Sequence, residues 1–437
     1  MIPNLAAAPT SAIGRNAEET AAFRKVIWRI VPILTVALLL NNMDRTNVGF
    51  AALTMNRDLG MTAREFGWGA GVLFASYSFL EIPSNILLYR FGARIWLTRI
   101  MITWGLLSAG TAFVTGPYSF IILRFFLGVA EAGYFPGIIY VFACWFPAHY
   151  RTQIFAWSLL SSPVASLLSG PLAAAILPMN GFLGLAGWQW MFIIEGVPCV
   201  LLGIALPWVI ADGPQKATWL TPRERDLVTG VLAAEDRDRP IESMWMAVRD
   251  IRVLVCAGIQ FGFLLGSYGL AVWLPLMLRG RGLGNAAASL LSSLPFLLGC
   301  VALVCWARLV DRTGKRIANL VVACFLGAGG FFLSLVTHQQ AFSYIGYTGL
   351  TLAVIGITTT RGLFWTIPPR ILQGRGAAGG IAFINTIGTL GGFLGPVALG
   401  WLRTTTGSFN GGLAIMAGVL VISGLLSASL RFTMPKE

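Results

Sequence analysis

The chain has 437 residues, of which 56% are hydrophobic and only 11% are charged, and its mean hydropathy is +0.74. This composition excludes a soluble globular protein, whose surface needs far more charge. The net charge of +13 would suit a nucleic-acid partner as well as a membrane protein, and the positions of the basic residues along the chain distinguish the two.

Apolar runs of about 20 residues, the length that crosses roughly 30 Å of hydrocarbon, recur along the chain. We predict twelve transmembrane helices, which begin near residues 26, 66, 95, 118, 153, 188, 252, 286, 317, 342, 377 and 411. A tail at 1–25 lacks the apolar core and cleavage site of a signal peptide, and 433–437 form a second tail. The polar interval 211–250 separates 26–210 from 251–432. The predicted fold class is therefore an all-α polytopic membrane protein with two pseudo-symmetric six-helix bundles.

The basic residues are distributed by membrane side. Of the 31 Lys and Arg residues, 23 lie in loops and helix ends on the side of the N-terminus, and three lie inside predicted helices. The opposite side holds five, namely Arg57, Arg64, Arg279, Arg281 and Arg403. By the positive-inside rule, both termini and the central loop are cytoplasmic. The charge thus indicates topology and predicts no nucleic-acid partner.

Cysteine and histidine give no sign of a metal centre or a catalytic centre. The two histidines, His149 and His338, fall in predicted loops on opposite sides of the membrane. The six cysteines lie in apolar runs without paired metal-ligand spacing, and we expect them to be small packing residues: Cys144, Cys199, Cys256, Cys300, Cys305 and Cys324. We therefore predict no enzyme activity, no cofactor and no metal.

Two sequence patterns recur in the two halves at nearly the same offset. YRFGAR (89–94) and DRTGKR (311–316) lie 222 residues apart, and SGPLAAAIL (169–177) and LGPVALGWL (394–402) lie 225 apart. A duplicated six-helix unit would explain both. Duplicated halves are usual in secondary transporters, which bind substrate near the midplane and work by alternating access. The alternative is a twelve-helix bundle whose turns merely look alike.

Several further stretches follow one another in the order typical of one family. They are MDRTNVGFA, EIPSNILL, RFFLGVAEAGYFPG, GWQWMFIIEGVP, YGLAVWLP and FINTIGTLGGFLGP. With the DRTGKR turn and the two-half layout, they resemble the major facilitator superfamily and, within it, the anion:cation symporters of tartrate, sugar acids and phthalate. The resemblance covers residues 26–432 and implies proton-coupled uptake of a small organic anion across a cytoplasmic (inner) membrane. We expect a monomer; the resemblance does not identify the anion.

Seven ionisable residues lie inside the predicted helices. Each costs roughly 2.5–3.5 kcal/mol at the bilayer centre, so each is expected to face a cavity or a partner. They are Asp44, Arg45, Glu81, Arg124, Glu131, Glu195 and Arg361.

The positions of four of these residues predict which of them meet. Asp44 and Arg45 are adjacent, about 100° apart around helix 1, so each needs a partner from elsewhere. Arg124 and Glu131 share one face of helix 4. Counting 1.5 Å per residue from the outer helix ends puts Asp44 at roughly 12 Å depth, Arg124 at about 9 Å and Glu131 at about 20 Å. We therefore expect Asp44 near Arg124 in depth, with Glu131 deeper and within reach of Arg45.

These four residues form a predicted proton and anion site. Burial favours the neutral form of a carboxyl group and a nearby guanidinium favours the charged form, so an anion that engages the arginine can change protonation. Arginine binds carboxylates through two parallel hydrogen bonds. We predict that Asp44 and Glu131 couple the proton and that Arg45 and Arg124 bind the anion, roles that the resemblance also implies. The alternative is a static ion-pair network between helices 1 and 4.

Other substrate-binding candidates are uncharged. Tyr77, four residues before Glu81 on helix 2, could present its hydroxyl to the cavity, with packing as an equal alternative. The resemblance implies substrate-facing positions at Tyr268, Trp365 and Asn385.

Four further polar residues of the helices are weaker candidates. Ser161 and Ser162 of helix 5 could contact substrate. For Glu81 and Glu195, which lie nearer helix ends or positions that support the repeat, we favour structural pairing.

Arg361 precedes the Phe-Trp of helix 10. This position is basic in some tartrate-like and phthalate-like carriers that the chain resembles, and need not be in carriers of sugar monoacids. A cation on the second half could hold a second carboxylate. The alternative is that Arg361 reaches out to the cytoplasm.

The DRTGKR turn predicts a cytoplasmic gate. Asp311, Arg312 and Arg316 lie at a helix junction, where they can pair and fasten one conformation. The first-half copy has Tyr89 where the family usually has aspartate, which weakens the case for an equivalent latch there.

The sequence as a whole predicts a proton-coupled symporter for a small organic anion. An uncoupled facilitator or exchanger is the alternative. A channel fits less well because the repeat favours a carrier, and a sensor fits less well because the central loop is too short for a signalling domain.

Overall fold

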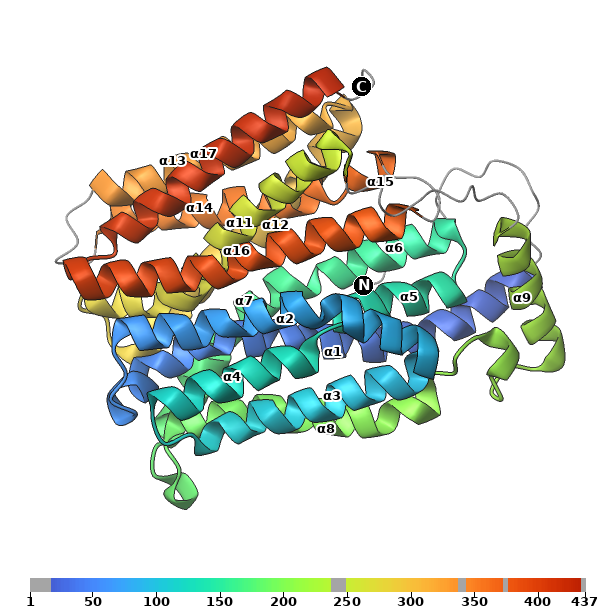
Figure 1. The fold of residues 1–437 in the computed structure, drawn as a ribbon, viewed down its shortest axis with the longest axis horizontal. Helices are drawn as coiled ribbons and strands as arrows, with labels where there is room; N and C mark the ends of the chain where they lie inside the picture. The colour runs from blue at the N-terminus through green and yellow to red at the C-terminus, as the bar shows by residue number, and fades with distance from the viewer. Residues whose placement is uncertain (1–16, 237–248, 337–342, 372–375, 434–437) are drawn as a thin grey trace.

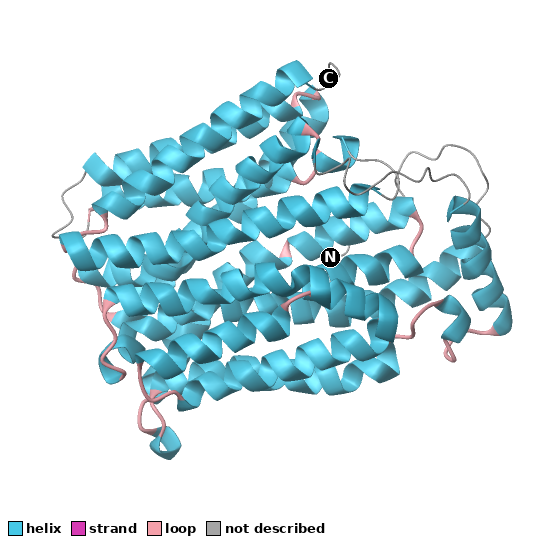
Figure 2. Ribbon diagram, in the orientation of Figure 1, coloured by secondary structure: helices cyan, strands magenta, loops and turns pink. Residues whose placement is uncertain are grey.

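The computed structural model describes residues 17–236, 249–336, 343–371 and 376–433, and no strand occurs in these ranges (Figures 1 and 2). The helices of the first half are α1 (Ala17–Asp58), α2 (Ala63–Phe91), α3 (Ala93–Gly110), η1 (Thr111–Phe113), α4 (Pro117–Glu131), α5 (Tyr134–Trp145), α6 (Ala148–Leu159), α7 (Ser161–Ile176), η2 (Leu177–Met179), η3 (Phe182–Gly184) and α8 (Gly187–Val209). After η4 (Pro214–Lys216) and α9 (Pro222–Asp236) come α11 (Ile251–Gly280), α12 (Asn285–Thr313), α13 (Arg316–Val336), α14 (Tyr344–Phe364), α15 (Pro368–Ile371), α16 (Gly376–Thr406) and α17 (Asn410–Thr433).

The described helices make twelve membrane spans. Eleven are long and apolar enough by composition to cross a bilayer, and the pieces α4 with α5 count among them as one continuous span. The twelfth is α3, which carries Arg94 and Arg99 and packs along α4 and α8. This confirms the predicted fold class, an all-α bundle of twelve transmembrane helices.

The same span-to-span contacts occur in both halves. In the first half α3 packs on α8, α2 on α4 and α1 on α7; six spans later, α13 packs on α17, α12 on α14 and α11 on α16. The halves meet where α2 lies against α16 and α7 against α12 (Figure 1). These two contacts are equivalent, because each span of one contact corresponds to a span of the other contact six spans away in the chain. The pairings therefore have the two-fold pseudo-symmetry of a duplicated six-helix unit.

The two ends of the bundle differ. α9 lies at one end, at the right in Figure 1, which we call the α9 end; the α1–α2 turn lies at the opposite end. There the halves meet backbone to backbone. A Cβ atom at Gly71 would lie 2.7 Å from the carbonyl oxygen of Phe393, and one at Gly67 would lie 2.6 Å from that of Pro396. Since Cβ contacts below 3.0 Å essentially never occur, the absence of side chains is what lets the halves close at this end.

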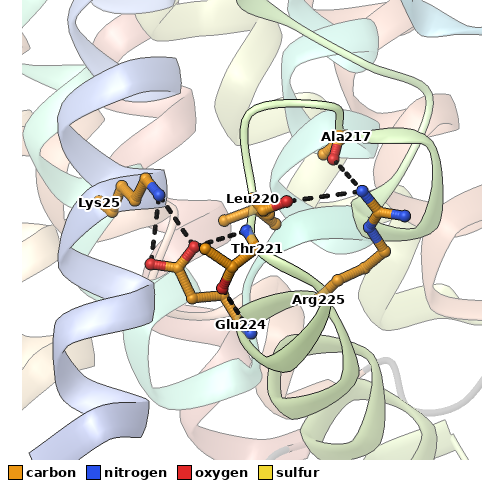
Figure 3. A network of polar contacts seen from close by, with 6 residues as sticks. All are labelled: Lys25, Ala217, Leu220, Thr221, Glu224 and Arg225. Atoms are coloured by element: carbon orange, nitrogen blue, oxygen red, sulfur yellow. Dashed lines mark hydrogen bonds and ion pairs between the residues drawn. The ribbon is translucent and has the colours of Figure 1, made fainter.

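Helix α1 extends before the apolar run that starts near residue 26, and its first described turns dock on the central segment. Lys25 donates to Glu224 of α9 at 2.8 Å, and the Glu224 carboxylate also accepts from the backbone of Thr221 (Figure 3). The Lys25 contact holds the pKa of Glu224 below its usual range. This exposed link is therefore present at neutral pH and is lost as acid protonates Glu224. The described part of the predicted loop 211–250 thus contains a helix attached to the first half.

Candidate functional site

A small cavity lies between the halves and is lined by both polar and apolar side chains. The first half lines it with Leu38, Asn41, Asn42, Arg45, Tyr77, Phe135, Ser158, Ser161 and Ser162, and the second half with Gln260, Phe263, Leu264, Tyr268, Arg361, Trp365, Asn385 and Thr389. Within the described residues, its charged groups are one arginine from each half. Such a lining suits a small polar anion.

Two spans are broken beside this cavity. Helix α4 ends at Glu131, and α5 begins after Gly133, whose φ of 89° lies in the left-handed region. The Ser84 hydroxyl satisfies the freed carbonyl of Ala132 at 2.5 Å. Between α6 and α7 the break falls at Leu160, next to the cavity serines. Irregular backbone at membrane depth is tolerated where it lines a cavity or is buried in protein, and it is a feature of transporter sites.

Arg45 joins the cavity to a buried carboxylate. Its Nε and Nη2 atoms each lie 2.9 Å from Oε2 of Glu131, while Glu131 Oε1 has no hydrogen-bond partner among the described residues. Glu131 is fully buried, and the Arg45 side chain is 12% exposed. The guanidinium also lies 4.8 Å from the ring centre of Tyr77, within range of a cation–π contact. The expected proximity of Arg45 and Glu131 is therefore present.

Asp44 and Arg124 lie behind the cavity wall rather than in it. Asp44 accepts hydrogen bonds from Ser108 at 2.5 Å and from the indole of Trp104 at 3.1 Å, both on α3. Arg124 is fully buried, and none of its three side-chain nitrogens has a hydrogen-bond partner among the described residues. The charges of Asp44 and Glu131 act on Arg124 without direct contact. The structure thus does not place Arg124 where it would touch a ligand in the cavity.

Arg361 faces the cavity from α14. Its Nη1 atom donates to the hydroxyl of Ser162 on α7 at 2.6 Å, so the contact crosses from one half to the other. This placement agrees with the interpretation in which Arg361 faces the cavity and not with the one in which it extends to the α9 end. It also explains why Ser162 lines the site.

The amide of Asn385 is fixed by partners on both halves. It accepts from Gln260 of α11 at 3.2 Å and donates to Glu81 of α2 at 2.6 Å, and Thr386 donates to the other Glu81 oxygen at 3.2 Å. Glu81 is fully buried. The structural pairing expected for Glu81 is thus a cross-half contact that orients a cavity side chain.

Three aromatic candidates line the cavity. Tyr77 stacks on Arg45, Tyr268 packs on Phe74 of the other half with ring centres 4.2 Å apart, and Trp365 follows the end of α14. The ring pair between Phe74 and Tyr268 joins the two halves beside the cavity.

Glu195, of span 6, is also buried next to this cluster. The side-chain amide of Asn47 donates to its Oε2 at 2.7 Å, and its Oε1 has no partner among the described residues. The pairing expected for Glu195 is therefore with an amide on α1.

The residues of the expected gate lie at the end of α12 and the start of α13. Asp311 and Arg312 are exposed and Arg316 is half-buried; within the described residues none of the three has an ion pair or side-chain hydrogen bond. In the first-half turn, where Tyr89 stands in place of the aspartate, a carboxylate from a distant part of the chain contacts the following helix. Asp212 accepts from the backbone N–H of Arg94 at 2.9 Å, at the start of α3.

Sequence reasoning missed nine cavity residues, which are all uncharged. Five of them are polar, namely Asn41, Asn42, Ser158, Gln260 and Thr389. An isolated amide or hydroxyl in an apolar helix scarcely changes its hydropathy. The one available signal for Asn41 and Asn42 was their place in the polar stretch that continues through Asp44.

Comparison with known proteins decides the family. Residues 34–396 match the family model of the Major Facilitator Superfamily. The chain belongs to this superfamily. Within it, a protein of Agrobacterium vitis named "Putative tartrate transporter" is 43% identical over 423 residues, which cover 96% of this chain and 94% of that protein. A "Quinolone resistance transporter" of Acinetobacter baumannii is 37% identical over 414 residues, 94% of each chain.

Solved structures of the superfamily have the same fold. The xylose transporter XylE of E. coli, in a partially occluded inward open conformation, aligns with a TM-score of 0.73 at 16% identity and covers 94% of this chain and 100% of that one. With the family and the relatives established, the chain is a multi-pass membrane transporter of a small molecule and not an enzyme.

Proposed function

We propose that the protein is a proton-coupled symporter that takes up a small organic anion by alternating access. The observation that carries this proposal is the position of Arg45, which lines the cavity and is held by the buried carboxylate of Glu131 at 2.9 Å. One side chain thereby contacts both the space for substrate and the group proposed to hold the proton.

The coupling follows from competition for Arg45. A carboxylate that enters the cavity and binds the guanidinium weakens its contact with Glu131, whose charge is then less well compensated in a buried place. Protonation of Glu131 removes that cost. Anion binding and proton binding therefore favour each other, and by linkage the effect is reciprocal. In this proposal Asp44 is the second coupling residue, and Arg124 balances the charges of Asp44 and Glu131.

We propose a dicarboxylate as substrate, because the cavity presents one cation from each half. Arg45 and Arg361 can each hold one carboxylate, while Tyr77, Tyr268, Trp365 and Asn385 contact the body of the ligand. The relative named for tartrate supports this class.

Replacing Arg361 with alanine tests the substrate class. We expect dicarboxylate affinity to fall about 10- to 100-fold, since a charge-assisted hydrogen bond contributes about 1.5–3 kcal/mol and 1.4 kcal/mol is tenfold. Monocarboxylate affinity should change much less. The measurement is a thermal-shift titration with matched mono- and dicarboxylates, with Arg370→Ala, an exposed arginine of α15, as control. Equal losses for both ligand classes, or none, would contradict a dicarboxylate bridge.

We further propose that the α9 end is cytoplasmic, that both termini lie there, and that the protein works as a monomer in the inner membrane. The excess of Lys and Arg on this side supports the orientation. Asp311, Arg312 and Arg316 would pair when the halves close at the α9 end, since among the described residues they have no side-chain partner while the opposite end is closed.

The glycine contacts at the opposite end give a test of alternating access. We expect Gly71→Ala to slow transport about tenfold or more, since an overpacked site costs about 1–3 kcal/mol and the cost falls only on the state closed at this end. Gly418→Ala is the matched control, because a Cβ atom there meets nothing within 4 Å. Initial uptake rates, normalised to the amount of protein in the membrane, provide the measurement. Equal rates for the two variants would show that this contact does not take part in the cycle.

A further inference from the structure

The cluster behind the cavity contains more buried carboxyl groups than cations. Asp44, Glu131 and Glu195 are each at most 4% exposed, and the guanidinium groups beside them are Arg45 and Arg124. Arg45 pairs with Glu131, and Arg124 feels the charges of Asp44 and Glu131. None of the ion pairs among the described residues includes Glu195. If all three carboxyls were ionised, one buried negative charge would lack a counter-charge, which is strongly unfavourable.

The hydrogen bonds indicate which carboxyl is the neutral one. Asp44 accepts from Ser108 and Trp104, one donor to each oxygen, and this arrangement stabilises a carboxylate. Glu195 accepts from one side-chain donor, the amide of Asn47 at 2.7 Å. The same amide lies 3.5 Å from Asp44, so an ionised Glu195 would also face a second negative charge through one shared donor.

The unpaired atoms point to a missing proton. Glu195 Oε1 and Asn47 Oδ1 are both buried without a hydrogen-bond partner among the described residues, and they belong to the two partners of one existing hydrogen bond. Both are acceptors when Glu195 is ionised. A proton on Oε1 supplies the donor, and the acid and the amide can then form a cyclic pair with two hydrogen bonds. Turning the amide round does not remove the need, because two acceptor oxygens would then lie 2.7 Å apart.

We infer that Glu195 is a further proton-binding site of this transporter, occupied in the state closed at the opposite end and linked to Asp44 through the amide of Asn47. Among the described residues, no cation pairs with Glu195, and the amide of Asn47 is its one side-chain hydrogen-bond donor. Helix α1 presents Asp44, α3 presents the uncharged Trp104 and Ser108, and Cys199 lies one turn along α8 with Tyr134 of α5 beyond it. This occupancy does not depend on the symport proposal; release of the proton during transport would rest on it.

Infrared spectroscopy of the purified protein at neutral pH tests the site directly, with the spectrum of each variant subtracted from that of the parent protein. The carbonyl stretch of a protonated carboxylic acid should be present in the parent protein and lost in Glu195→Gln, whose amide keeps both hydrogen bonds to Asn47. Asn47→Leu should retain the band and shift it to higher wavenumber, because the acid then loses its partner. Glu224→Gln, in an exposed ion pair, is the control and should leave the band unchanged.

An unchanged spectrum in Glu195→Gln would overturn the inference, since it would mean that Glu195 is ionised. If Glu195→Gln fails to fold, the shift of the carbonyl band in Asn47→Leu is by itself the test of the site. The spectrum is recorded without substrate or gradient. The Glu195 inference can therefore be wrong while gradient-driven uptake is observed, and it can be right while such uptake is absent.

Discussion

Glu131→Gln is expected to abolish accumulation of substrate against its gradient while leaving binding and exchange largely intact. Glutamine has nearly the same size and can still contact Arg45, but it cannot take up and release a proton at transport pH. The imposed pH gradient would then no longer act on the anion. In proteoliposomes, the ratio of internal to external substrate should fall to about one, whereas counterflow of labelled substrate should persist.

The control for this variant is Glu224→Gln, which removes a glutamate from an ion pair outside the cavity. It should accumulate substrate like the parent protein. Accumulation by Glu131→Gln at the parent level would show that Glu131 is not the coupling residue.

Arg45→Ala should eliminate measurable substrate binding. Arg45 is the first-half cation of the cavity, and it is also the partner of Glu131. A charge-assisted hydrogen bond contributes about 1.5–3 kcal/mol and a guanidinium can make two of them to one carboxylate, so we expect affinity to fall at least about 100-fold. Arg45→Lys should restore little, because an ammonium group cannot bridge two acceptors in the planar geometry of a guanidinium.

Ligand-induced stabilisation in a thermal-shift assay measures this loss, and Arg57→Ala is the control, since Arg57 is an exposed arginine of the same helix. The empty Arg45→Ala protein must first show a cooperative transition of its own. If that folded protein bound the anion with unchanged affinity, Arg45 would have no part in recognition.

The sequence predicted the spans well and the breaks within them poorly. Apolar runs locate membrane helices because twenty residues are needed to cross the bilayer. The end of α4 at Glu131 depends on the left-handed Gly133 and on a hydroxyl from Ser84 of another span, which hydropathy does not report. The part of α1 that precedes the apolar run packs against α9, a contact between distant segments that hydropathy does not report.

Depth counting predicted the heights of these residues but not their hydrogen-bond partners. It placed Glu131 deeper than Arg45 and still within its reach, and the structure has that pair. It placed Asp44 and Arg124 at similar depth; the charge of Asp44 acts on Arg124, but Asp44 accepts its hydrogen bonds from Trp104 and Ser108 of α3. Rise along a helix gives height only, and the direction in which a side chain points depends on how the helices pack.

The same limit explains why the uncharged partners were not predicted from the sequence. Asn47 and Gln260 connect to a buried carboxyl group and to a cavity side chain, yet neither stands out in an apolar helix until the packing is known. The charged residues were evident from sequence because their burial in a membrane is costly.

The central claim is that an anion bound in the cavity strengthens proton binding to Glu131, and that the bound proton strengthens anion binding in turn. It is tested most directly by uptake into proteoliposomes of the carboxylate that stabilises the protein most in the thermal-shift screen, with the interior made alkaline. The account predicts accumulation above the external concentration that collapses when a protonophore is added. Uptake that only equilibrates, at the same rate with and without the gradient, would contradict proton-coupled symport and leave an uncoupled facilitator.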